Sequence, residues 1–158
     1  MRVRKVRTTT TIDPHIWQTP KFRDLSQGAQ WLWFTLQSHP QLSWAGTLDY
    51  NHARLAELAT DLIPDDVAHY AHELETMGYI HIDHRTQELL LADYTNTSTN
   101  LRSPNHAKAT AIAIGDIHSR KLMHIVINTL KDIATSHPYS GGMNVPEIQN
   151  LITDTDQQ

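Results

Sequence analysis

The stretch NHARLAELATDLIPDDVAHYAHELETMGYIHIDHRTQELLLA, residues 51–92, contains the pattern that decides the fold. Its first part has apolar residues at the 3.6-residue spacing of a helix, namely Leu55, Leu58, Ala59 and Leu62. After a short turn, Pro64 suits the first position of a second helix, and Gly78 suits the left-handed residue that follows a helix. Residues 79–82 and 88–92 have the alternating or apolar character of strands, joined by a polar turn. The sequence therefore predicts two tandem helices followed by a β-hairpin.

This order of elements is typical of a winged helix-turn-helix, a module that most often binds nucleic acid. In such a module the second helix, here residues 64–77, enters the major groove. Its outward side chains are Asp65, Asp66, His69, His72, Glu73 and Thr76. A phosphate backbone repels an acidic face of this kind, so the charge pattern opposes the usual mode of binding.

The rest of the chain predicts further helices on both sides of this module. One runs from Ser26, a good N-cap, to about residue 38, and two more follow over about 104–114 and 119–135. We therefore expect an α+β, mainly helical fold: a winged helix-turn-helix with a two-helix C-terminal extension. The expected segments are a basic N-terminal arm (1–7), a winged-helix domain (8–95), a linker (96–102), C-terminal helices (103–136) and a flexible tail (137–158).

The composition describes an ordinary globular protein. The chain has 158 residues, of which 39% are hydrophobic, and it has no cysteine. Disulfides, thiolate nucleophiles and zinc fingers are thereby excluded. No apolar run approaches the roughly 20 residues of a membrane span, and the basic N-terminus leads into threonines rather than a signal core. We expect a cytoplasmic protein that does not contact a membrane.

The net charge of −4 conceals an uneven distribution. Counting Lys and Arg against Asp and Glu, residues 1–23 have a local charge of +5, residues 24–99 of −9, and residues 100–158 of zero. A basic arm therefore precedes an acidic body.

Five short motifs extend the pattern beyond the helix-turn-helix. They are IDPHIW (12–17), KFRDLS (21–26), WLWF (31–34), AGTL (45–48) and LETMGYI (74–80). In their order and spacing, residues 8–95 resemble the N-terminal winged helix of phage and plasmid replication-initiation proteins, of the replisome-organiser or DnaD type. Residues 103–106 and 119–122 also look like the stretch that follows the wing in phage members. The resemblance implies binding to a replication origin and recruitment of replication proteins.

The residues expected to contact DNA fall into two groups. Phosphate contacts would come from the arm and from the tip of the hairpin, through Arg2, Arg4, Lys5, Arg7 and Arg85. Base edges would be reached from the second helix by His69, His72 and Thr76. For the arm, the alternative is a solubilising leader with no contact to DNA.

The acidic helix face has two further interpretations. Asp65, Asp66 and Glu73 can dock a basic protein partner, which would make the module one for protein–protein interaction. Alternatively, Asp65 and Asp66 only complement the helix dipole. Near the C-terminus, the apolar stripe of one helix either closes the core or forms a homodimer, and it consists of Leu122, Ile125, Val126, Leu130 and Ile133.

Eleven histidines raise the question of a metal site. His69 and His72 lie three residues apart, and His81, Asp83 and His84 follow at the hairpin, but no further ligand is fixed close to them. We therefore interpret the histidines as polar surface and expect no metal, no cofactor and no enzyme activity. Because histidine gains charge below about pH 6.5, we predict that DNA affinity rises on mild acidification.

Overall fold

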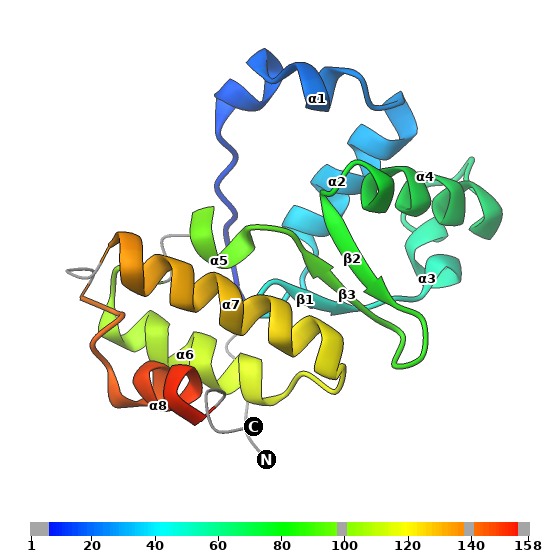
Figure 1. Ribbon diagram of the computed structural model, residues 1–158. Coiled ribbons are helices and arrows are strands. Elements are labelled where there is room, and N and C mark those ends of the chain that lie inside the picture. The colour runs from blue at the N-terminus through cyan, green and yellow to red at the C-terminus, as the bar shows by residue number, and fades with distance from the viewer. Residues whose placement is uncertain (1–6, 98–100, 138–140, 155–158) are drawn as a thin grey trace.

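The computed structural model describes residues 7–97, 101–137 and 141–154 of the chain. In these ranges helices predominate, and short strands form one small antiparallel sheet near the centre of the molecule (Figure 1). The elements are, in order, η1 (Pro14–Gln18), α1 (Pro20–Arg23), α2 (Gln27–Ser38), β1 (Thr47–Asp49), α3 (His52–Ala56), α4 (Pro64–Thr76), β2 (Ile80–Asp83), β3 (Glu88–Leu91), α5 (Tyr94–Thr97), α6 (Pro104–Gly115), α7 (Arg120–Ser136) and α8 (Pro146–Asp154). The expected α+β, mainly helical class is confirmed. The order α2-β1-α3-α4-β2-β3 is compatible with a winged helix.

One face of the sheet packs against α2, α3 and α4. The inner side of α4 is formed by Val67, Ala71 and Leu74, which are buried at the positions that the helical spacing predicts. They share a core with Leu32 and Leu36 of α2 and with the inward side chains of the strands. This packing fixes α4 on the sheet and leaves its opposite side in solvent.

The other face of the sheet packs against the C-terminal helices. The strand order is β1-β3-β2, so β3 is the central strand. Its Leu89 and Leu91 belong to the first core, whereas Leu90 points the other way into a core formed with α6, α7 and α8. Since both faces of β3 are covered, its continuous apolar run has a direct structural explanation. Much of the α7 stripe is buried in this second core and is thus covered by the chain itself.

Two glycines with positive φ direct the chain at the edges of these elements. Gly78, with a φ of 74°, follows α4 as the sequence predicts. Gly46, with a φ of 82°, precedes β1. A Cβ at Gly46 would lie 2.6 Å from the Cβ of Tyr94, so glycine allows α5 to approach this segment closely.

The C-terminal region differs from the sequence-based expectation. The prediction of a flexible tail over 137–158 is wrong for residues 141–154, where α8 forms and Met143, Val145 and Ile148 are buried. Gly142 lies so close to the Leu101 carbonyl, to which its N–H donates at 2.9 Å, that a Cβ would clash with it. The Ser-Gly-Gly run therefore allows the chain at Gly142 to pass close to the segment that contains Leu101.

The predicted linker and the first helix of the tandem also require correction. Residues 98–100 of the linker 96–102 lie outside the described residues, but Leu101 is buried in the second core. Helix α3 ends at Ala56, so Leu58 lies after the helix and is 55% exposed, although the spacing predicted it to be buried.

Candidate nucleic-acid interface

The outer side of α4 presents a continuous polar stripe. Asp65, His69, His72 and Thr76 are all exposed and follow one another at intervals of four, three and four residues. This spacing places them on one side of the helix, opposite the buried Val67. The three side chains expected to reach base edges are thus together and accessible to solvent.

Most of the α4 carboxylates are engaged inside the protein. Asp66 Oδ2 accepts from the Ile63 N–H at 3.0 Å and so caps the start of α4. Glu75 Oε1 accepts from the Ile82 N–H of β2, also at 3.0 Å. Each bond satisfies a backbone donor that belongs to the fold. Most carboxylates of this helix therefore serve to cap α4 or to attach neighbouring segments to it.

Glu73 makes the most extensive of these connections. Its Oε1 accepts from the Ser26 N–H and its Oε2 from the Ser26 hydroxyl, both at 2.6 Å. Ser26 is in turn the N-cap of α2, where its Oγ accepts from the Ala29 N–H. Burial alone would raise the pKa of Glu73, but the bonds from Ser26 outweigh it and the pKa is lowered. Among the described residues, Asp65 is the α4 carboxylate whose side chain forms no such hydrogen bond.

The hairpin is attached to α7 by a second set of carboxylate bonds. Buried Glu88 accepts from the backbone N–H groups of His118 at 2.9 Å and Ser119 at 2.6 Å. The Ser119 hydroxyl, which caps α7, donates to Asp83 Oδ2 at 2.6 Å. Lys121 Nζ donates to the Ile82 carbonyl at 3.0 Å. The two hairpin carboxylates therefore hold the start of α7 against the sheet.

These bonds also shift the pKa values of the hairpin carboxylates. Burial alone would raise the pKa of Glu88, but the donated hydrogen bonds, with that of the His118 N–H foremost, lower it overall. The pKa of Asp83 is lowered chiefly by the Ser119 hydroxyl and then by the Arg85 N–H. Both carboxylates are thereby stabilised in their charged form.

The hairpin tip places a cation in solvent. Arg85 is exposed, and its N–H donates to Asp83 Oδ1 at 3.0 Å, which shapes the turn. Beside it, the His84 ring lies 5.8 Å from that of Tyr50. Lys121 of α7 is exposed, yet its ammonium group is bonded to the Ile82 carbonyl of strand β2. Only a contact between residues far apart in the chain reveals this position.

A second cation, Lys21, lies near the end of α4 and was not among the residues that the sequence predicted to contact DNA. Lys21 Nζ lies 5.0 Å from the centre of the Tyr79 ring, a cation–π contact. It is also 3.5 Å from where a Cβ on Gly78 would stand. Lys21 from α1 is therefore brought to the C-terminal end of α4.

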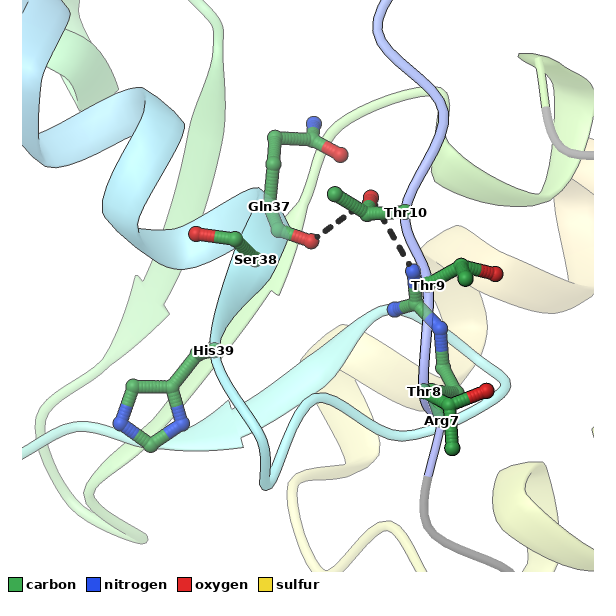
Figure 2. A pocket seen from close by; sticks show the side chains of 7 residues that line it. All are labelled: Arg7, Thr8, Thr9, Thr10, Gln37, Ser38 and His39. Carbon is green, nitrogen blue, oxygen red and sulfur yellow. Dashed lines mark hydrogen bonds between the residues drawn. The ribbon is translucent and has the colours of Figure 1, made fainter.

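The described part of the N-terminal arm is attached to the body. Arg2, Arg4 and Lys5 lie outside the described residues. The Arg7 guanidinium lies 5.5 Å over the Tyr94 ring and donates to Thr10 Oγ1 at 3.3 Å, and Thr10 donates to the Gln37 carbonyl at 3.0 Å. Arg7, Thr10 and Gln37 line a cavity of about 160 Å³ together with Thr8, Thr9, Ser38 and His39 (Figure 2). Arg7 is thus partly buried and attached to the body.

Two histidines are held towards their neutral form. Burial lowers the pKa of His39, which lies at the end of α2. Burial also lowers the pKa of His81, and the nearby Lys121 adds to the effect. Neither side chain belongs to the exposed α4 stripe.

Within residues 7–97, 101–137 and 141–154, neither a cluster of metal-binding side chains nor a helix able to span a membrane is present. There, no group of three or more His, Asp or Glu side chains is placed to hold a metal ion. The helices of these ranges lack the combination of length and apolar character that crossing a membrane requires. Comparison of the chain with protein-family models, with curated proteins and with solved structures found no match.

Proposed function

We propose that the chain is a winged-helix DNA-binding protein of phage or mobile-element origin that acts in replication initiation or local regulation. The observation that supports this most is the outer stripe of α4. It offers hydrogen-bonding side chains to solvent, while Asp66, Glu73 and Glu75 form bonds within the fold. The element order and the strand order β1-β3-β2 are compatible with a winged helix, which supports the proposal.

In the proposed complex, α4 lies in the major groove and the hairpin lies along the backbone. His69, His72 and Thr76 contact base edges, because imidazole and hydroxyl groups donate and accept hydrogen bonds there. Arg85 contacts a phosphate from the hairpin tip. The arm residues Arg2, Arg4 and Lys5 add phosphate contacts, and Lys21 supplements them at the end of α4.

The bonded carboxylates reduce the electrostatic obstacle to this mode. Glu73 accepts two hydrogen bonds at the start of α2, and Glu88 accepts two at the start of α7. The positive end of a helix dipole partly offsets a carboxylate placed there. Asp65 is then the α4 carboxylate that most directly opposes a phosphate.

The alternative function, protein docking through Asp65, Asp66 and Glu73, has less support. Two of these three carboxylates already accept bonds from backbone groups of the same chain. A partner would have to compete with those bonds or contact only their outer edges.

A binding titration tests the proposal. Fluorescence anisotropy with a duplex selected from random sequences compares the wild type with the His69→Ala/His72→Ala/Thr76→Ala variant. Since a good base contact contributes about 1–3 kcal/mol, we expect the triple variant to bind the selected duplex on the order of 100-fold more weakly. His124→Ala, at an exposed position of α7, serves as the control. Equal affinities of the wild type and the triple variant would rule out α4 as the DNA-contacting helix.

A further inference from the structure

The connection between α3 and α4 exposes two large apolar side chains. Leu58 is 55% exposed and Ile63 is 58% exposed, and both belong to the same short connection. Single apolar residues on a surface need no explanation, but neighbouring ones often mark a site of interaction. These two side chains are also distinct from the polar stripe proposed to contact DNA.

Exposed carboxylates flank these two apolar residues in the chain. Glu57, Asp61 and Asp65 are all exposed, and they precede, separate and follow Leu58 and Ile63 in the chain. We call these five residues the acidic turn surface. A connection that exposes both apolar and acidic side chains is complementary to a segment in which basic and apolar residues are interspersed.

The chain itself contains such a segment at its N-terminus. Residues 1–6, which lie outside the described residues, have the sequence MRVRKV, with apolar residues at 1, 3 and 6 and basic residues at 2, 4 and 5. We propose that the acidic turn surface binds residues 1–6 of a second copy of this chain. The valines would contact Leu58 and Ile63, and the cations would face the carboxylates.

The geometry favours a second copy over the same molecule. Arg7 and Thr10 attach the arm next to α5 and the end of α2. In Figure 1 the blue segment that begins at residue 7, where the arm joins the body, and the connection from α3 to α4 lie on opposite sides of the sheet. If each copy gives its arm to the other, the two identical contacts close a dimer. This inference does not depend on the proposed function, although an arm held in this way cannot contact DNA at the same time.

Light scattering on the full chain over a range of concentrations measures the association. We expect a dimer in dilute salt, and a dissociation constant that rises on the order of tenfold when the salt concentration rises from about 50 to about 500 mM, because exposed charge pairs are screened. A monomer at every concentration in dilute salt would overturn the proposal.

Charge exchange between the two partners tests the assignment of the contact. The arm variant Arg2→Glu/Arg4→Glu/Lys5→Glu and the surface variant Asp61→Lys/Asp65→Lys should each be monomeric alone and form a mixed dimer when combined. Asp132→Lys, an exposed reversal on α7, should dimerise like the wild type. Dimers of either charge-reversed variant alone, or the absence of a mixed dimer between two folded variants, would overturn it.

Discussion

Glu73 and Ser26 connect the outer part of α4 to the start of α2 through two hydrogen bonds of 2.6 Å. One carboxylate thus satisfies both the backbone N–H and the hydroxyl of a residue that is itself an N-cap. The relationship explains why an acidic residue stands on a helix proposed to approach DNA. Its carboxylate contributes to the attachment of α2 to α4, independently of any ligand.

Removal of this contact should reduce stability. For Glu73→Ala we expect the free energy of unfolding to fall by about 1 kcal/mol, the usual effect of losing a helix cap. Asp132→Ala removes an exposed carboxylate from α7 and should change it by less than about 0.5 kcal/mol. Urea denaturation followed by circular dichroism measures both values. Equal effects of the two substitutions would show that the Ser26 bonds do not stabilise the fold.

Ser119→Ala should loosen the hairpin from α7. The hydroxyl is buried, caps α7 and donates to Asp83, so its loss should cost about 1–2 kcal/mol. Amide hydrogen exchange should accelerate at Leu122, whose N–H donates to that hydroxyl. Ser38→Ala is the matched control, because this exposed hydroxyl only bonds carbonyls of its own helix. Unchanged exchange at Leu122 would contradict the proposed role of the Ser119 hydroxyl in holding the start of α7 to the hairpin.

Stability should decline in two steps as the pH falls, and histidines determine the first. The pKa values of His39 and His81 are lowered, so these groups bind fewer protons in the folded than in the unfolded chain. Their contribution is complete above the unfolded value of about 6.5 and is lost as the pH falls towards the folded values. The urea midpoint should decrease between about pH 6.5 and 5. His39→Asn/His81→Asn should remove this first step, and a wild-type midpoint that stays constant over this range would contradict the prediction.

Carboxylates determine the second step. The pKa values of Glu73, Glu88 and Asp83 are lowered in the folded chain, so their stabilisation is present above the unfolded values of about 4 and is lost as the pH falls through the folded values. The urea midpoint should therefore fall again below about pH 4.5. Glu88→Gln should reduce the size of this step, and an undiminished step in this variant would exclude Glu88 as a contributor.

Sequence patterns predicted the local features of the fold and missed its long-range contacts. Periodicity, Ser26 and Gly78 indicated α2, α4 and the start of the hairpin, because caps and amphipathic spacing are local properties. Local patterns could not predict the hydrogen-bond partners of the carboxylates, because Glu73 bonds a residue 47 positions away and Glu88 bonds one 31 positions away. Similarly, the flexible tail predicted for residues 137–158 did not anticipate the close contact of Gly142 with Leu101.

For the candidate site residues, the sequence predicted which side chains lie on α4 and at the hairpin tip. It did not predict which of them are already bonded to other groups of the protein. His69, His72, Thr76 and Arg85 are exposed as the spacing and the turn suggested. Helical spacing treats Asp65 and Asp66 alike, although Asp66 caps α4 and Asp65 forms no such cap. The side chain of Arg7 is likewise attached to the body by Tyr94 and Thr10, which no local pattern indicates.

Charge substitutions should alter DNA binding in opposite directions. Asp65→Asn removes the exposed carboxylate of the stripe and should increase affinity, whereas Arg85→Ala should weaken binding similarly for all duplex sequences. For Arg85→Ala, the slope of log affinity against log salt should decrease by about 0.9, as expected for one lost phosphate contact. Anisotropy titrations at several salt concentrations measure both effects. A slope unchanged by Arg85→Ala would exclude its phosphate contact.

The most direct test of the central claim is to map the DNA-contacting surface by nuclear magnetic resonance. Adding a selected duplex should shift the side-chain signals of His69 and His72 and the amide signals of Thr76 and Arg85. The signals of His124, on α7, should stay in place. Shifts confined to α7, or to the connection between α3 and α4, would contradict the proposal that the outer stripe of α4 contacts DNA.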